Sequence, residues 1–297
     1  MKHVVNVSGG EASWFTAECV TEEQGTANTT LLFADTFIED EDCYRFLIES
    51  SAHALRVARP RKIQQLCKKA LTIPPLNKMQ WRKWALKELA RDVMRAIPGL
   101  VWIAEGRDPW DVFKDVRFIG NSRVDPCSRT LKRDFLDAWV KRNCDPATTV
   151  QYFGLDANEE HRLNRLRERR VGWTVKSPLI ERGIFKEFIR NEAEVRGIKR
   201  PRLYDLGFPH ANCGGMCVKA GQGQFKLLLA KLPERYAYHE ARELSVIKHI
   251  GSSKNIGILR DRSGGETNPI SLGQFKERVL NGANIDQFDL GGCGCAI

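Results

Sequence analysis

The sequence predicts an α/β fold built around a doubly wound, parallel sheet of five strands. Short apolar runs alternate along the chain with segments of helical periodicity, which is the pattern of a parallel sheet with crossover helices. The 297 residues include 42% hydrophobic residues, enough for a substantial core. No apolar stretch reaches the roughly 20 residues that span a bilayer. We therefore expect a globular protein of one or two domains.

The first third of the chain has a strand–helix–strand pattern. An apolar strand is expected at Val4–Val7, followed by a turn and a helix at Ala12–Gln24 whose apolar residues recur at helical spacing. A second strand follows at Thr29–Phe33. The acidic run Glu39-Asp40-Glu41-Asp42 then begins a helix, because acids in a first turn complement the helix dipole.

Strands and helices continue to alternate up to Pro178. Further strands are expected at 100–104, 116–119 and 149–153, and further helices at 62–71, 79–96, 131–141 and 159–169. Beyond Pro178, helices are expected at 185–195 and 225–232. Residues 1–178 form the predicted α/β domain. Residues 179–297, with many glycines and two close pairs of cysteines, form a predicted helical, cysteine-rich subdomain.

The positive charge is concentrated in one segment. The chain carries 47 basic and 37 acidic residues, a formal charge of +10. Twelve of the basic residues and only two of the acids lie in residues 56–98, so this segment is +10 and the remainder is neutral. Without it, the helix ending near Leu55 would lead directly to the strand at Leu100. The segment is therefore predicted to be a basic helical insertion.

Two tryptophans, Trp81 and Trp84, stand among the cations of this segment. Aromatic side chains among cations suit a nucleic acid, whose phosphates meet the charges and whose bases stack on the rings. The alternative is an amphipathic helix that packs both tryptophans on the core. We predict a polyanionic partner, tRNA or DNA, bound by Arg61, Lys62, Lys68, Lys69, Trp81, Arg82 and Lys83.

The stretch Ser8-Gly9-Gly10-Glu11-Ala12-Ser13 joins the first strand to the first helix. Two glycines let the backbone approach an anion, the N–H groups of the helix terminus point at it, and Ser8 and Ser13 add hydroxyl groups. An ordinary strand-to-helix turn is the alternative interpretation. The loop is not a Walker A motif, because no Gly-Lys-Ser/Thr follows.

The pattern Ser-Gly-Gly-x-x-Ser resembles the PP-loop of the N-type ATP pyrophosphatases and the phosphoadenosine-phosphosulfate (PAPS) reductases, especially phage-type proteins similar to the reductases. Four further stretches resemble the family in the expected order: Leu31–Thr36, Asp125–Lys132, Gly154–Arg162 and Tyr204–Cys217. The resemblance implies a HUP-type sheet and an adenine nucleotide, ATP or PAPS, with magnesium. It implies nucleotide contacts by Ser8, Gly9, Gly10, Ser13, Asp35, Thr36, Gly154 and Arg162, and catalytic roles for Cys127, Lys132 and Asp156.

The loop departs from the family at Glu11-Ala12, where the pyrophosphatases have Lys-Asp. This exchange removes a cation that would meet the phosphates and adds a negative charge beside them. Lys132, Arg129 or Arg162 is a candidate to replace the cation. Asp35 and Asp156 are candidate magnesium ligands, the alternative for each being a helix cap or turn residue.

Nine cysteines in a chain without a secretory signal favour metal or thiol chemistry over a disulfide framework. Cys213 with Cys217 and Cys293 with Cys295 lie in glycine-rich stretches. They predict a four-thiolate site for zinc or a 4Fe-4S cluster. A redox-active dithiol at Cys293 and Cys295 is the alternative, since the reductases attack with a cysteine of a C-terminal Cys-Gly tail. Cys127 is predicted to be a reactive thiol, a cluster ligand or an inert buried residue.

The resemblance implies adenylation, in which ATP is converted to AMP and pyrophosphate and the activated centre then receives sulfur or nitrogen. With the basic segment, it predicts a sulfur-transfer modification of a nucleic acid, with a separate sulfur donor. One alternative is a sulfonucleotide reductase that uses Cys293 or Cys295 with a thioredoxin-like partner. Another is a non-catalytic nucleic-acid-binding protein on a degenerate nucleotide fold. We expect a cytoplasmic protein with no membrane partner.

Overall fold

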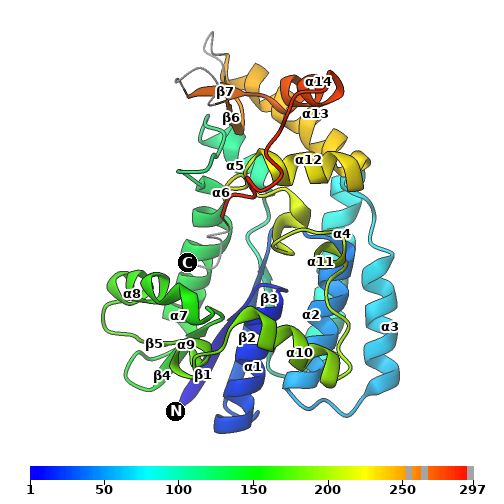
Figure 1. Cartoon of the computed structure of the whole chain (residues 1–297). Coiled ribbons are helices and arrows are strands. Elements are labelled where there is room, and N and C mark those ends of the chain that lie inside the picture. The colour runs from blue at the N-terminus through cyan, green and yellow to red at the C-terminus, as the bar shows by residue number, and fades with distance from the viewer. Residues whose placement is uncertain (252–255, 262–266, 293–297) are drawn as a thin grey trace.

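A computed structural model describes residues 1–251, 256–261 and 267–292, so Cys293 and Cys295 lie outside the described residues (Figure 1). Its centre is an all-parallel sheet of five strands in the order β3-β2-β1-β4-β5. The strands are β1 (Lys2–Val7), β2 (Thr29–Asp35), β3 (Leu100–Ala104), β4 (Thr149–Phe153) and β5 (Thr174–Lys176). The predicted five-stranded parallel sheet is confirmed.

Helices cover both faces of this sheet. On one face, Val5 and Phe33 belong to a core shared with α1 (Glu11–Gln24), α2 (Glu41–Ala54), α3 (Pro60–Leu71) and α4 (Met79–Ala96). On the other face, Val4 and Leu32 pack with Val140 of α7 (Asp134–Asn143). β1 and β2 are buried on both faces, with the apolar stretches Val4-Val5 and Leu31–Ala34 at their centres. The doubly wound architecture is confirmed.

One predicted strand is wrong and one strand was missed. The stretch at 116–119 follows α5 (Pro109–Asp115), a helix that starts with a capping box between Asp108 and Asp111 and buries Trp110. It leads into irregular chain instead of the sheet. The fifth strand is β5, an edge strand of three residues in which only Val175 is buried. A strand this short leaves too little alternation to be recognised in the sequence.

A second hydrophobic core lies beyond the carboxyl ends of the strands, in the upper part of Figure 1. Ile38 and Leu76 contribute to it, and its other buried residues come from 110–131 and from Leu203 onward. Its elements are α5, α6 (Pro126–Ser128), η2 (Arg129–Arg133), α11 (Arg202–Asp205), η4 (Asn212–Gly215), α12 (Gln222–Lys231), α13 (Pro233–Ile250), β6 (Leu259–Asp261), β7 (Asn268–Ile270) and α14 (Leu272–Leu280). In the sequence between β4 and α11, the chain also forms η3 (Ala157–Glu159), α8 (Glu160–Arg169), α9 (Pro178–Glu181) and α10 (Lys186–Val195).

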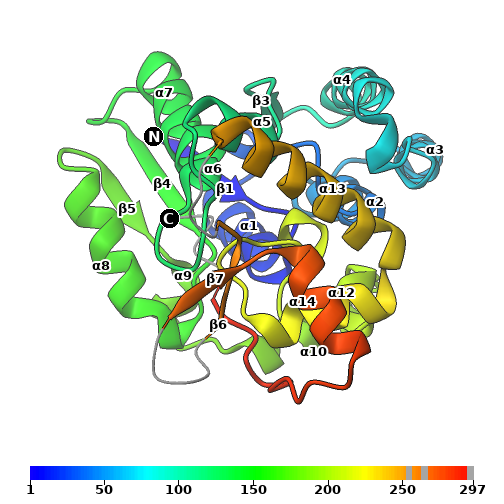
Figure 2. The same ribbon diagram turned by 90° about the horizontal axis from the view of Figure 1, so that it is seen from above.

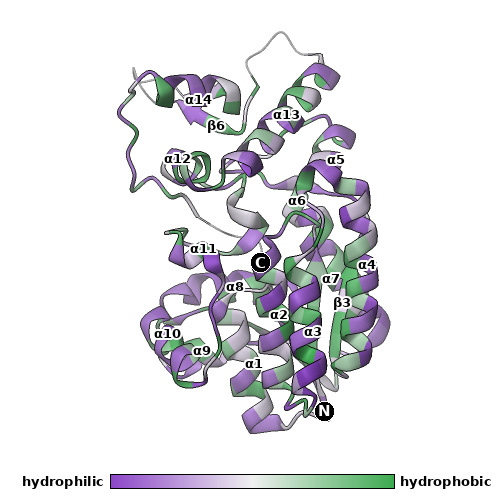
Figure 3. Cartoon of the chain, turned by 90° about the vertical axis from the view of Figure 1, so that its right-hand side faces the viewer, coloured by the Kyte–Doolittle hydropathy of each residue, from purple (hydrophilic) through white to green (hydrophobic). Residues whose placement is uncertain are grey.

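The basic segment takes part in the main core. Ile63 and Leu66 of α3 and Leu86 and Leu89 of α4 belong to the same buried cluster as Val5 of the central strand. The outward-facing turns of α3 are mostly hydrophilic, as the purple colour in Figure 3 shows. The segment therefore serves the fold with one face and presents its charge on the other. Among the described helices, none has both the length and the apolar composition that a membrane crossing requires.

Candidate nucleotide site

A cavity opens at the carboxyl end of the sheet between β1 and β4. In the strand order, β2 lies on one side of β1, and β4 followed by β5 lies on the other. The connections from β1 to β2 and from β4 to β5 therefore run in opposite directions. Such a switch point leaves a crevice outside the strand ends, where open α/β sheets bind ligands. The cavity measures about 730 Å³ with its mouth included. Its walls come from the β1–α1 loop, the β4–α8 connection and residues 186–212.

The β1–α1 loop forms one wall with a fixed backbone. Gly9 has a φ of +75°, and a Cβ atom there would lie 2.5 Å from Sγ of Cys43 on α2, so only glycine fits. Ser13 Oγ donates to the carbonyl of Gly10 at 2.9 Å and accepts from the N–H of Ser8 at 3.1 Å. Both predicted serines, together with Gly10, therefore lie at the cavity.

Gly154 lines the cavity beside this loop, immediately after β4. A Cβ atom at this position would lie 2.6 Å from both the N and the Cα atoms of Ser13. The end of β4 thus lies directly against the first turn of α1, and no larger residue is compatible with this approach. Two glycine stretches separated by more than 100 residues in the sequence meet at one cavity because their strands are neighbours.

Two cations line the cavity, Arg162 of α8 and Lys186 of α10. Arg162 forms an ion pair with Glu159. The other candidates for the missing loop cation do not line this cavity. Lys132 is buried and pairs with Glu39 at 3.1 Å, and Arg129 is exposed and lies 3.3 Å from Asp134. Of the three cations considered from the sequence, only Arg162 lies at the cavity.

Glu11 is compensated by a cation that the sequence did not indicate. Its Oε1 lies 3.0 Å from Nε of Arg200, whose guanidinium stacks on the ring of Tyr204 at 4.7 Å. Burial raises the pKa of Glu11, while Arg200 opposes this shift. Burial also raises the pKa of Tyr204, so its hydroxyl stays protonated at the cavity wall. The charge introduced at Glu11 is therefore neutralised locally.

Asp35 and Thr36 do not face the cavity. Asp35 Oδ1 accepts hydrogen bonds from the N–H of Phe37 and the hydroxyl of Tyr44, both at 2.7 Å, and Oδ2 accepts from Trp102 Nε1 at 3.2 Å. Burial of this carboxyl raises its pKa to about 6. Thr36 is also buried and donates to Glu39. The prediction that Asp35 is a magnesium ligand is wrong, because both oxygens are used inside the core.

Asp156 is a helix cap, the alternative considered from the sequence. Its Oδ1 accepts from the N–H of Asn158 at 2.9 Å, and Glu159 returns a bond to the N–H of Asp156. Lys186 Nζ lies 3.9 Å from Oδ2. Asp156 thus shapes the wall that carries Arg162. The described geometry gives it a structural role and assigns it no catalytic one.

The acidic run after β2 is a capping and bridging element. Asp40 accepts from the N–H of Asp42 at 3.0 Å and so caps α2 as expected. It also binds Arg202 through two hydrogen bonds of 2.8 Å. Glu41 pairs with Arg82 at 2.6 Å and with Arg235 at 3.3 Å. These acids hold the basic segment and the second core against the sheet.

Three of the seven cysteines in the described residues lie in the second core. Cys127, Cys213 and Cys217 are buried in one apolar cluster, and Cys213 donates its N–H to Glu39. Within the described residues no three His, Cys, Asp or Glu side chains form a group able to hold a metal. The predicted four-cysteine site also requires Cys293 and Cys295, outside these residues, and stays a prediction. Cys127 does not line the nucleotide cavity.

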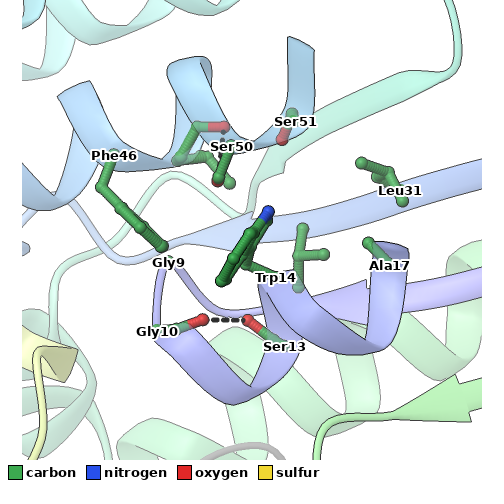
Figure 4. Close-up of a pocket in the computed structure, with 11 residues that line it drawn as sticks. Gly9, Gly10, Ser13, Trp14, Ala17, Leu31, Phe46, Ser50 and Ser51 are labelled. Atoms are coloured by element: carbon green, nitrogen blue, oxygen red, sulfur yellow. Dashed lines mark hydrogen bonds between the residues drawn. The ribbon is translucent and has the colours of Figure 1, made fainter. Parts of the chain in front are cut away.

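A second, smaller cavity of about 210 Å³ lies between the loop and α2 (Figure 4). Trp14, Phe46 and Leu31 make its walls largely apolar, and Ser50 and Ser51 contribute its only hydroxyl groups apart from Ser13. No charged side chain of the described residues lines it. The larger cavity offers an anionic ligand two cations and the helix terminus, beside the acids Glu11 and Glu159.

The predicted nucleic-acid residues fall into three groups: exposed residues, residues in ion pairs and one buried arginine. Arg61, Lys62 and Lys68 are exposed, and Trp81 is 67% exposed. Lys69 and Lys83 are held in ion pairs of 2.8 and 2.9 Å with Asp92 and Asp111.

Arg82 is fully buried and donates to the carbonyls of Phe37 and Glu39 at 2.7 and 2.6 Å. The prediction that Arg82 contacts nucleic acid is wrong, because its guanidinium is used to hold α4 on the sheet.

Several cavity residues were not predicted as nucleotide contacts: Lys186, Tyr204, Asn212 and His210, which was considered only as an additional metal ligand or a structural histidine. Three of them lie in or beside the stretch Tyr204–Cys217, whose family resemblance was the available signal. Lys186 had no signal, because an isolated lysine at a helix start is ordinary.

Comparison of the chain with models of known families finds no match, and the curated proteins and solved structures yield none either. The PP-loop resemblance therefore stays a prediction.

Proposed function

We propose that the chain binds an adenine nucleotide in the β1/β4 cavity and activates an acceptor by adenylation, releasing pyrophosphate from ATP. One observation carries the proposal. Ser8, Gly10 and Ser13 of the loop were selected by their order in the sequence together with Gly154 and Arg162, and they line one cavity at the switch point of the sheet, whereas Gly9 lines the smaller cavity.

The charges of the cavity suit phosphate groups. Arg162 and Lys186 line the cavity on the α8 and α10 side, where they lie beside the acids Glu159 and Asp156, and Arg200 neutralises Glu11 beside the loop. The first N–H groups of α1 have no partner within the helix, so they are donors for a phosphate that lies at the loop. The cavity therefore offers cations and backbone donors from opposite walls, an arrangement that can orient a polyphosphate chain.

Adenylation breaks the bond between the α-phosphorus and the bridging oxygen to the β-phosphate, while an acceptor oxygen bonds to the α-phosphorus. The electron pair of the broken bond leaves with pyrophosphate. Arg162 and Lys186 would stabilise that developing charge. Magnesium, when bound, would neutralise the same phosphates, but Asp35 does not fit it as a ligand, and no step here is assigned to the metal.

A pair of arginines on one helix tests the proposal. Arg162→Ala should weaken ATP binding about tenfold, because it removes a charge-assisted contact. Arg165→Ala is the matched control, since Arg165 is exposed on α8 and does not line the cavity. Calorimetry with ATP, PAPS and GTP measures both variants. Absence of adenine-nucleotide binding by the wild type, or equal affinities of the two variants, would contradict the site.

Product analysis separates the alternatives. Release of pyrophosphate and AMP supports adenylation, which we expect with a nucleic acid as the acceptor. Release of sulfite from PAPS with a thiol donor supports the sulfonucleotide reductase, whose candidate nucleophiles Cys293 and Cys295 lie outside the described residues. Binding without either product supports a non-catalytic nucleotide fold.

A further inference from the structure

Two tryptophans form an exposed pair at the beginning of α4. The side chains of Trp81 and Trp84 are 67% and 61% exposed, and their ring centroids lie 6.4 Å apart with the planes at 85°. In this edge-to-face arrangement the two rings do not stack on each other, so the indole faces stay largely open to another molecule. The sequence alternative, in which both tryptophans pack on the core, is not what the fold adopts.

The pair is not needed to hold α4 in place. The buried face of the helix consists of Leu86, Leu89 and Val93, all within the main core. Arg82 lies between the tryptophans in sequence and is bonded to the backbone of Phe37, Glu39 and Pro74. The first turns of α4 are therefore held rigidly while two large apolar rings remain in solvent. Such rings are typical of a surface that another molecule covers.

The charges around the pair indicate a polyanion. Lys78, in the turn before α4, precedes Trp81 by three residues, and Lys87 follows Trp84 by three, so each lysine neighbours one tryptophan and the two lysines flank the pair on either side. Both are exposed, and neither forms an ion pair with an acid in the described part of the chain. Residues 56–98 as a whole contain twelve basic and two acidic residues. The exposed rings are thus set in a strongly positive field.

We propose that Trp81 and Trp84 form a stacking platform for unpaired bases of a single-stranded nucleic acid, with Lys78 and Lys87 binding its phosphates. Bases in a duplex are stacked on each other and do not offer their faces to the indoles, so the platform favours single strands. An anionic membrane is less suited to this face. An interfacial helix inserts a continuous apolar face, and that face of α4 is already buried in the core.

The platform lies at the same end of the sheet as the nucleotide cavity. Arg82 and Lys83, between the two tryptophans in sequence, contact Phe37, which follows the carboxyl end of β2 by two residues. Seen from above, α4 and α8 lie on opposite sides of the molecule, with the strand ends between them (Figure 2). A nucleic acid bound on the platform would therefore have to cross the molecule to reach the cavity (Figure 2). That the same nucleic acid is also the acceptor rests on the proposed function.

Binding of a fluorescent oligothymidylate, measured by anisotropy without ATP, tests the stacking. The double variant Trp81→Ala/Trp84→Ala should bind at least about tenfold more weakly than the wild type, since base–aromatic stacking contributes on that order. Phe288→Ala is the matched control, because Phe288 is an exposed aromatic residue distant in sequence from the segment. Thermal unfolding verifies that each variant is folded, which the exposure of these side chains leads us to expect.

The charge component has a separate readout. Lys78→Gln/Lys87→Gln should lower the dependence of log affinity on log salt by about 0.7 per lysine. Lys141→Gln/Arg142→Gln, on exposed residues at the end of α7, should leave it unchanged. Equal binding of duplex and single strand, wild-type affinity of the tryptophan variant, or preferential binding to anionic vesicles would overturn the proposal. Because these measurements omit ATP, their outcome is independent of the nucleotide site.

Discussion

The loop after β2 and the loops after β1 and β4 all lie at the carboxyl ends of the strands, but their polar residues have different roles. After β2, Asp35, Glu39 and Asp40 are all at most 1% exposed and bonded to other parts of the chain. After β1 and β4, Ser13 and Arg162 lie at a cavity. Both regions contain the polar residues that suggest a site in a sequence.

The strand order explains this difference. The connections after β1 and β4 diverge at the switch point and leave a crevice. The loop after β2 lies away from that point, and Arg202 and Arg235 of the second core and Arg82 of α4 cover it with ion pairs. Its acids therefore stabilise the fold. Functional chemistry at this sheet edge is expected only where the chain does not cover the strand ends.

Removal of Arg82 should produce the largest effect on stability. Arg82→Ala removes one of the ion pairs of Glu41 and leaves two buried carbonyls without their donor, and we expect a loss of about 3–5 kcal/mol in the free energy of unfolding. Arg91→Ala removes only an exposed pair with Glu88 and should change it by less than about 1 kcal/mol. Urea denaturation measures both. Equal stability of the two variants would contradict the structural role of the β2 loop.

The pH dependence of stability sharpens the comparison through Asp35. Because burial raises its pKa in the folded state to about 6, folding is favoured while the carboxyl is protonated. This contribution is present below the unfolded pKa of about 3.8 and is lost as the pH rises toward 6. It amounts to at most about 3 kcal/mol.

Asp35→Asn removes this titration. The free energy of unfolding of the wild type minus that of the variant, measured by denaturation from pH 4 to pH 7, should therefore decrease as the pH increases. A difference that stays constant with pH would show that Asp35 is ionised in the folded protein throughout.

A methyl group at Gly154 should break the cavity with a smaller effect on stability. The Cβ atom of Gly154→Ala would meet Ser13 at 2.6 Å and force β4 away from α1, at a cost of about 1–3 kcal/mol. Nucleotide binding should be lost in the folded variant. Gly292→Ala, with no heavy atom within 4 Å of the new Cβ, is the control. Wild-type nucleotide affinity of Gly154→Ala would place the binding site elsewhere.

The features that could be predicted from the sequence are those set by interactions between residues close together in the chain. The glycine loop and its neighbouring strands were recognisable because local spacing and turn chemistry define them, and the loop does lie at the end of β1. Arg82 and Asp35 were placed in functional sets because a cation in a basic segment and an acid after a strand look alike whether buried or exposed. Their burial depends on Phe37, Tyr44 and Trp102, which only the fold brings close.

By itself, the sequence determined the alternation of strands and helices, the parallel sheet, the glycine loop at its centre and the position of the basic segment. These follow from periodicity, turn chemistry and charge counts along short stretches of chain. The tertiary structure decided which polar groups remain at a cavity or surface. It paired Lys132 with Glu39 and Glu11 with Arg200, and it left Trp81 exposed. Pairing and burial are long-range properties, because they depend on residues that only folding brings into contact.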